Sequence, residues 1–122
     1  MAIIKLKKTA EGQPQQAIMA AMGTEIYCKC VVVVDEDVDI FNLSDVMWAV
    51  ITRTRADRDL MFVHRAMGAI LDPSSDPKDN TLTKMGIDAT KPGGQDHAQR
   101  LFIADEQRAR AREIMAASGI RI

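Results

Sequence analysis

The sequence lacks the long apolar runs and the charge imbalance that are typical of membrane proteins and nucleic-acid-binding proteins. No apolar stretch approaches the roughly 20 residues that a membrane helix needs, and the N-terminus shows no charged segment followed by an apolar one and a cleavage site. Sixteen Lys and Arg residues against seventeen Asp and Glu residues give a formal net charge of -1. No global field therefore attracts nucleic acid or an anionic membrane, and we expect a cytoplasmic protein that binds neither.

Cysteine and histidine are scarce, which limits metal and redox chemistry. Cys28 and Cys30 stand two apart in a predicted strand, where both side chains share one face and are poorly placed to bridge each other. We interpret them as reduced packing residues, because a metal site would need further ligands from elsewhere. His64 and His97 have no cysteine or acidic partner at catalytic or ligand spacing, and we interpret both as packed or surface residues. The common phosphate-binding, dinucleotide-binding and nucleophile motifs are also absent.

The composition that remains is that of one globular domain in which short strands alternate with helices. Apolar residues make up 47% of the 122 residues and charged residues 27%. Strands are predicted near residues 3–6, 27–34 and 60–63, with amphipathic helices between them at 14–22 and from 42 to about 53. The run Val31 to Val34 is apolar on both faces, which is typical of a central strand covered on both sides. We therefore predict an α/β fold, a βαβαβ three-layer sandwich with a mainly parallel sheet.

The chain after the third strand changes in character. Residues 68–80 are rich in Gly, Asp, Pro, Ser and Asn, which predicts a long irregular loop. A further short strand is predicted at residues 84–90, and Asp105 could cap a C-terminal helix that stops before Gly119. We predict a single domain over residues 1–122, with a core at 1–92 and a C-terminal extension and helix at 93–122.

Helix-end signals accompany the first two predicted helices. Pro14 suits the first turn of one helix, and Gly23 suits a left-handed stop at its end. Asn42 could cap the next helix, with Asp45 as its capping-box partner. The apolar stripe of that helix is wide and consists of Leu43, Val46, Met47, Val50 and Ile51.

An acidic run follows the predicted central strand, at the end where open α/β sheets bind ligands. It consists of Asp35, Glu36, Asp37 and Asp39, of which Asp37 and Asp39 are the best candidates for a functional pair. We favour solvated carboxylates that bond the backbone over a divalent-metal site. A nearby group of arginines, Arg53, Arg55, Arg58 and Arg65, could hold a carboxylate or phosphate, but we favour pairing with Asp57, Asp59 and the acidic run.

Three stretches resemble one protein family in order and approximate spacing. They are VVVVDEDVD at 31–39 running into NLSDVMWAV at 42–50 and Thr52-Arg53, ADRD at 56–59 through LDPS at 71–74, and KMGIDATKP at 84–92. Together they resemble the C-terminal domain of UbiD-type decarboxylases. The resemblance covers most of the chain and fades after Gly93.

The resemblance implies a role in the reversible decarboxylation of aromatic or α,β-unsaturated acids with prenylated FMN. In that family the flavin, its divalent metal and the catalytic Glu-Arg-Glu residues belong to a larger N-terminal domain that is absent from this sequence. It implies that this chain alone carries no catalytic, cofactor-binding or metal-binding residue. We expect a small subunit or isolated C-terminal domain that partners a larger flavin-binding UbiD-like subunit in a homo- or hetero-oligomer, which the terminal helix helps to assemble.

The resemblance also assigns a substrate-contact role to the loop after the third strand. Met67, Ile70 and Leu71 are the expected apolar substrate contacts, and a loop bearing Gly and Pro on a rigid sheet agrees with that role. Asp72 and Ser74 are expected to fix the loop through an Asx-type or hydroxyl bond.

Two alternatives remain open from the sequence. One is a non-catalytic α/β module that binds or self-associates through an exposed apolar face. The other is an independent small enzyme that uses the acidic run with a metal, which we rank last. Met1 directly precedes the first predicted strand, which favours a separate subunit, and a piece cut from a longer enzyme would have almost the same sequence.

Overall fold

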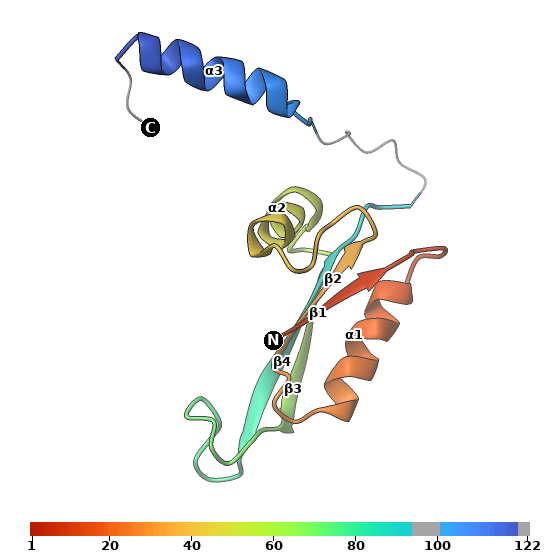
Figure 1. The fold of residues 1–122 in the computed structure, drawn as a ribbon. Helices are drawn as coiled ribbons and strands as arrows, with labels where there is room; N and C mark the ends of the chain where they lie inside the picture. The colour runs from red at the N-terminus through yellow and green to blue at the C-terminus, as the bar shows by residue number, and fades with distance from the viewer. Residues whose placement is uncertain (94–100, 120–122) are drawn as a thin grey trace.

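The computed structural model describes residues 1–93 and 101–119, which contain four strands and three helices (Figure 1). In chain order these are β1 (Ala2–Leu6), α1 (Gln13–Thr24), β2 (Cys30–Asp35), α2 (Leu43–Arg53), β3 (Leu60–Met67), β4 (Thr81–Ala89) and α3 (Asp105–Ala117). The strands form one sheet in the order β1-β2-β4-β3, in which β1, β2 and β4 are parallel. The predicted α/β fold with a mainly parallel sheet and a C-terminal helix is confirmed.

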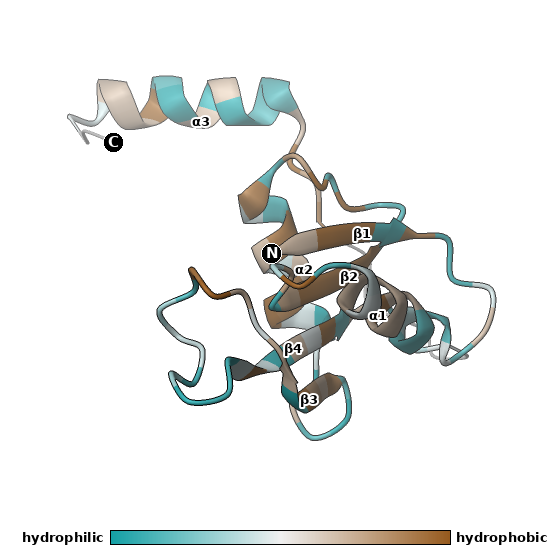
Figure 2. Ribbon diagram, turned by 90° about the horizontal axis from the view of Figure 1, so that it is seen from below, coloured by the Kyte–Doolittle hydropathy of each residue, from teal (hydrophilic) through white to brown (hydrophobic). Residues whose placement is uncertain are grey.

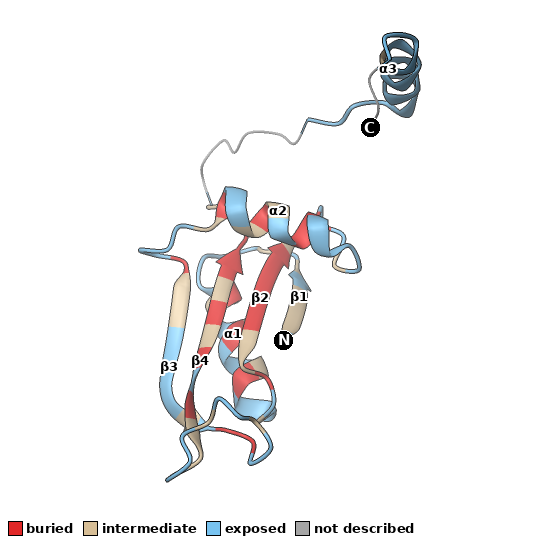
Figure 3. Cartoon of the chain, turned by 90° about the vertical axis from the view of Figure 1, so that its left-hand side faces the viewer, coloured by how far each residue is buried: buried red, intermediate tan, exposed pale blue. Residues whose placement is uncertain are grey.

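Strand β2 is the strand around which both helical layers pack. Its four consecutive valines, Val31 to Val34, are all buried, and alternate valines point to opposite faces of the sheet. One core cluster joins Val31 and Val33 to Ile18 and Met22 of α1, and the other joins Val32 and Val34 to Val46 and Ala49 of α2. Figure 3 shows β2 as the most continuously buried strand. The prediction of a central strand covered on both sides is confirmed.

Strand β3 differs from the expected pattern, because it runs antiparallel to β4 at the edge of the sheet. A third strand that followed a helical crossover would be parallel to its neighbour. Instead β3 pairs with the strand that comes next in the chain, through the loop of residues 68–80, and β4 takes the place beside β2. The pairing of β3 shifts between Val63 and Ala66, where Arg65 has a φ of 56°, as in a β-bulge.

The predicted capping of α2 is confirmed in part. Asn42 Oδ1 accepts the backbone N–H of Ser44 at 3.1 Å. The backbone N–H of Asn42, which Asp45 would accept in a capping box, donates to Asp39 O at 3.1 Å, and Asp45 Oδ2 accepts the backbone N–H of Asp39 at 2.7 Å. Asp45 therefore ties the first turn of α2 to the acidic run.

Two predicted helix ends are wrong. Helix α1 continues through Gly23 to Thr24, and the left-handed conformation occurs instead at Gly12, before the helix, with a φ of 86°. The N-cap of α3 is Ala104, and Asp105 lies in the first turn, where a negative charge favours the helix dipole. The predicted end of α3 before Gly119 is confirmed.

Large apolar side chains remain exposed on α2 and near α3. The predicted apolar stripe of α2 is only partly covered, because Leu43 and Ile51 are 60% and 76% exposed while Val46 is buried. Helix α3 buries none of its residues, and Figure 2 shows it as a mixture of hydrophilic and paler segments, in contrast to the hydrophobic strands β1 and β2. These surfaces are available to another molecule.

None of the helices described for this chain has the length and apolar character needed to cross a bilayer.

The close approach of α1 to β4 predicts that Gly86 cannot be enlarged. A Cβ atom at Gly86 would lie 2.3 Å from Cγ2 of the buried Ile18, so we expect Gly86→Ala to lower the free energy of unfolding by about 1–3 kcal/mol. A Cβ atom at Gly23 would meet nothing within 4 Å, and Gly23→Ala should raise stability by about 0.5 kcal/mol through its helix propensity. Urea unfolding of both variants checks this, and equal stabilities would contradict it.

Candidate functional site

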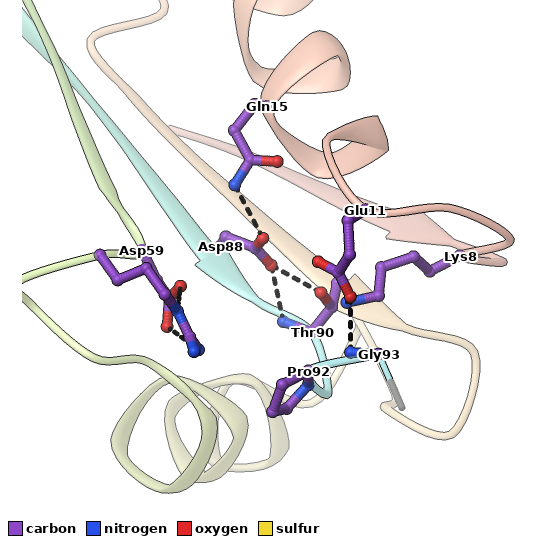
Figure 4. Close-up of a pocket in the computed structure, with 9 residues that line it drawn as sticks. Lys8, Glu11, Gln15, Asp59, Asp88, Thr90, Pro92 and Gly93 are labelled. Carbon is purple, nitrogen blue, oxygen red and sulfur yellow. Dashed lines mark hydrogen bonds and ion pairs between the residues drawn. The ribbon is translucent and has the colours of Figure 1, made fainter. Parts of the chain in front are cut away.

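A small polar pocket lies past the carboxyl ends of β1 and β4, where open α/β sheets commonly bind ligands (Figure 4). Its volume is about 240 Å³. Five charged residues line it, namely Lys8, Glu11, Arg58, Asp59 and Asp88. They come from the segment between β1 and α1, from the segment before β3 and from the end of β4.

The charged and polar groups of this pocket bond to one another. Asp88, which is buried, accepts the backbone N–H and the hydroxyl of Thr90 at 2.9 and 2.7 Å, and the side-chain amide of Gln15 at 3.1 Å. Glu11 forms an ion pair with Lys8 at 3.1 Å, and the hydrogen bond from Lys8 is the main reason that the pKa of Glu11 is lowered. Among the described residues, the buried amide oxygen of Gln15 has no hydrogen-bond partner. The bond between Gln15 and Asp88 joins α1 to β4.

The acidic run is held by Arg53 at the end of α2. The Arg53 side chain is 1% exposed. Its guanidinium donates to Asp35 Oδ2 at 2.8 Å and to both carboxylate oxygens of Asp37 at 2.7 and 3.0 Å. It also lies 4.9 Å from the centre of the Trp48 ring, within the range of a cation–π contact. Lys91 adds an ion pair to Asp37 at 2.9 Å. The predicted pairing of the arginine group with the acidic run is confirmed for Arg53.

This pairing accounts for the electrostatics of the acidic run. The hydrogen bonds from Arg53 are the main reason that the pKa of Asp37 lies far below its ordinary value. Asp39, the other member of the candidate pair, accepts the backbone N–H of Phe41 at 3.0 Å and so shapes the turn before α2. In the part of the chain that the structure describes, no group of three or more His, Cys, Asp or Glu residues is arranged to hold a metal ion.

Two further arginines also pair with acidic residues as predicted. Arg55 bonds Asp57 at 2.8 Å, and Arg58 bonds Asp59 at 2.6 Å. Arg65 instead bonds Asp79 in the loop after β3 at 3.1 Å. Each of the four arginines of this group therefore bonds a carboxylate.

The histidine and cysteine side chains show no catalytic arrangement among the described residues. His64 is exposed on β3, where its Nδ1 lies 3.2 Å from Thr83 Oγ1 and its ring stacks near Phe62. His97 lies outside the described residues. Cys28 is buried just before β2, which begins at Cys30, and both thiols are free. Burial raises the pKa of Cys30, which disfavours the reactive thiolate.

The three expected substrate contacts lie at the opposite end of the sheet from the polar pocket. Met67 is the last residue of β3, and Ile70 and Leu71 follow in the loop that leads to the start of β4 (Figure 1). Met67 is 65% exposed, Ile70 89% and Leu71 86%. The structure therefore places all three within one short segment and leaves them open to contact with another molecule.

The loop of residues 68–80 is closed by its own hydrogen bonds. At its base the backbone N–H of Gly68 donates to Asn80 O, and the Asn80 side-chain amide donates to Gly68 O, both at 2.8 Å. Near its tip Asp72 Oδ1 accepts the backbone N–H of Ser74 at 2.9 Å and its hydroxyl at 2.8 Å. The expected Asx-type and hydroxyl bonds of Asp72 and Ser74 are confirmed.

Sequence reasoning missed a residue that ties the tip of this loop to the sheet. Lys29 Nζ lies 2.8 Å from Asp72 Oδ2 and donates to Ser74 Oγ at 3.0 Å. Because 45 residues separate Lys29 from Ser74, no local pattern in the sequence signals the contact.

Comparison with known proteins agrees with this architecture. Residues 1–89 match the family model described as the 3-octaprenyl-4-hydroxybenzoate carboxy-lyase C-terminal domain. The chain belongs to the UbiD C-terminal domain family. The predicted resemblance to UbiD-type decarboxylases is therefore confirmed for this domain.

Three relatives illustrate the relationship of the chain to UbiD-family proteins. Anhydromevalonate phosphate decarboxylase from Methanocaldococcus jannaschii is 39% identical over 107 residues, which cover 86% of this chain and 25% of that protein. The UbiD-class enzyme HmfF from Pelotomaculum thermopropionicum in complex with FMN matches with a TM-score of 0.78 and 42% identity, over 87% of this chain and 24% of that one. Vanillic acid decarboxylase from Sedimentibacter hydroxybenzoicus in open form matches with a TM-score of 0.73 and 33% identity, over 95% of this chain and 26% of that one. The chain thus spans about a quarter of the length of these relatives.

The Arg53 network predicts that the contribution of Asp37 to stability depends on pH. The pKa of Asp37 in the folded chain is below its ordinary value of 3.8, so its stabilising effect is complete above about pH 5 and is lost as pH falls below 3.8. At pH 7 we expect Asp37→Asn to lower the free energy of unfolding by about 1–2 kcal/mol. A fully buried pair would lose more, but the Asp37 side chain is 43% exposed and partly screened.

Urea unfolding between pH 7 and pH 3 measures this effect, and the difference between wild type and variant should shrink toward acid pH. Glu36→Gln is the matched control, because Glu36 is an exposed neighbour that forms no ion pair within the described residues. A difference for Asp37→Asn that stays constant over this range would be inconsistent with the network.

Proposed function

We propose that this chain is the small subunit, or the isolated C-terminal domain, of a UbiD-like reversible decarboxylase. In this proposal it completes the substrate pocket of a separate, larger subunit that binds prenylated FMN. The observation that carries the proposal is the exposure of Ile70 and Leu71, at 89% and 86%, on a hydrogen-bonded loop of a chain about a quarter as long as its relatives. When another molecule covers large apolar side chains held in this way, their removal from water lowers the free energy.

The proposal places the cofactor and its metal on the partner, and the polar pocket of this chain supports that placement. The polar pocket has a volume of only about 240 Å³, and its charged groups bond to one another. The described residues also contain no metal-ligand cluster. Prenylated FMN supplies the electron-accepting chemistry for loss of CO₂ when it is bound. The role left to this chain is to bind the apolar part of the substrate and to exclude water.

The substrate class in this proposal is an aromatic or α,β-unsaturated carboxylic acid. Met67, Ile70 and Leu71 offer apolar contact area without a charged group of their own, which suits the ring or chain of such an acid and leaves its carboxylate to the partner. The name of the vanillic acid decarboxylase relative supports an aromatic acid.

Closure of the chain over its partner is part of the proposal. The vanillic acid decarboxylase relative has both an open form and a closed form, which supports a motion of this kind. Closure would bring the loop of residues 68–80 toward the substrate and shed water from the pocket, and opening would then limit turnover.

A non-catalytic module that self-associates is the alternative. The exposed apolar residues Leu43, Met47 and Ile51 on α2, together with the unburied α3, favour contact with another chain whether or not catalysis follows. The oligomeric state and the activity of the purified chain separate the two functions.

Copurification tests the proposed function. The chain, coexpressed with a flavin-binding UbiD-like subunit encoded in a neighbouring open reading frame, should copurify with that subunit. Decarboxylation of an aromatic or α,β-unsaturated acid should require both proteins. Homo-oligomers of this chain that bind no flavin subunit would favour the alternative. An isolated chain that decarboxylates without flavin or partner would refute the subunit role.

Substitution of the loop residues tests the substrate contacts. In the two-subunit enzyme, Ile70→Ser and Leu71→Ser should each lower kcat/KM on the order of tenfold, because each removes apolar contact with the substrate. Met19→Ser, at an exposed position on the outer face of α1, is the matched control and should leave kcat/KM unchanged. The flavin content of all variants should equal that of wild type. If the loop variants and the control have the same kinetics, the loop does not contact substrate.

A further inference from the structure

Lys29 connects the substrate-contact loop to the rigid part of the sheet. Lys29 immediately precedes β2, and its carbonyl oxygen accepts the backbone N–H of Met85 in β4 at 2.8 Å. Its backbone is therefore fixed by the two central strands. Its side chain extends to the loop, where Nζ contacts Asp72 Oδ2 at 2.8 Å and Ser74 Oγ at 3.0 Å.

Asp72 links Lys29 to Ser74 at the tip of the loop. One carboxylate oxygen receives Lys29, and the other accepts both the backbone N–H and the hydroxyl of Ser74. The side chain of Asp72 is only 15% exposed. The hydrogen bond from Lys29 is the largest cause that lowers the pKa of Asp72 to about 2, so the carboxylate stays ionised at neutral pH.

Ile70 and Leu71 are the two central residues of a turn that Asp72 closes. The backbone N–H of Asp72 donates to Ala69 O at 2.9 Å, which is the hydrogen bond of a four-residue β-turn. Ala69 is 2% exposed and anchors the start of the turn. Asp72 is the last residue of the turn, so the positions of Ile70 and Leu71 depend on the contacts that hold Asp72 in place.

Lys29 provides the external anchor of Asp72. Bonds between Gly68 and Asn80 and between Ser75 and Ala69 join loop residues to each other. The bonds of Arg65 in β3 and Thr81 in β4 reach Asp79, on the far side of the loop from Asp72. Within residues 1–93 and 101–119, Lys29 is the one side chain from outside the loop that bonds Asp72 or Ser74.

We propose that Lys29 is a positioning residue, which holds Asp72 and Ser74 and through them sets the positions of Ile70 and Leu71 for substrate contact. This role rests on the proposed function and deepens it. An ion pair of this exposure contributes little to global stability, so its effect is local to the turn. Met67 belongs to β3 and does not depend on Lys29.

The order of the loop in the full 122-residue chain is the first test. Lys29→Met keeps the apolar stem and removes the ammonium group, and the backbone ¹⁵N heteronuclear NOE values of residues 70–72 and 74 should fall. Lys78→Met is the matched control, because Lys78 lies exposed in the same loop and its ammonium group bonds nothing in the described part of the chain. Lys29→Arg keeps a cationic donor and should retain most of the order. Unchanged NOE values in Lys29→Met would overturn the proposal.

Kinetics of the two-subunit enzyme form the second test. Lys29→Met should lower kcat/KM on the order of tenfold, as small displacements of substrate contacts do, mainly by raising KM. Its urea midpoint and flavin content should stay at the wild-type values, and Lys29→Arg should recover most of the loss. A Lys29→Met enzyme with a disordered turn and wild-type kcat/KM would also overturn the proposal. If the wild-type mixture is inactive, the proposed function fails, whereas the NOE values still decide whether Lys29 orders the turn.

Discussion

Burial of β2 on both faces is the constraint on which the rest of the structure depends. Four consecutive valines lie between α1 and α2, and each contributes about 1.5–3 kcal/mol when it leaves water. This packing fixes the two helices on opposite sides of one strand and places β1 and β4 on its two edges. It also positions the buried Lys84 on β4, whose ammonium group donates to the carbonyl oxygens of Met22 and Glu25 near the end of α1 at 2.9 Å.

The two ends of the sheet carry different kinds of chemistry. At the carboxyl end, charges from separate segments neutralise one another, as Arg53 does for Asp35 and Asp37. At this end of the sheet, where α/β proteins commonly bind ligands, the ion pairs connect α2 to the end of β2. At the amino end of β4 the chain instead presents apolar side chains on an ordered loop. The proposed function assigns the reacting groups to a partner and leaves the apolar contact surface to this domain.

Sequence patterns predicted the features that depend on local periodicity. The run Val31 to Val34 identified the central strand, and Asn42 identified the start of α2. The antiparallel direction of β3 was not predicted, because direction depends on which strand fills the place beside β2, and no residue in β3 encodes that choice alone. The exposure of Leu43 and Ile51 could not be predicted either, because an apolar stripe on a helix has the same sequence pattern whether a sheet or another molecule covers it.

The closed base of the 68–80 loop has a consequence for how this domain can diversify. Gly68 and Asn80 bond each other directly, and a Cβ atom at Gly68 would come within 2.4 Å of Ser75 Oγ and 3.0 Å of the Asn80 carbonyl oxygen. The two stems are thus held at a fixed separation, while Ile70 and Leu71 between them are exposed. The residues between the stems of such a loop can change during evolution without a change in the strands that carry it.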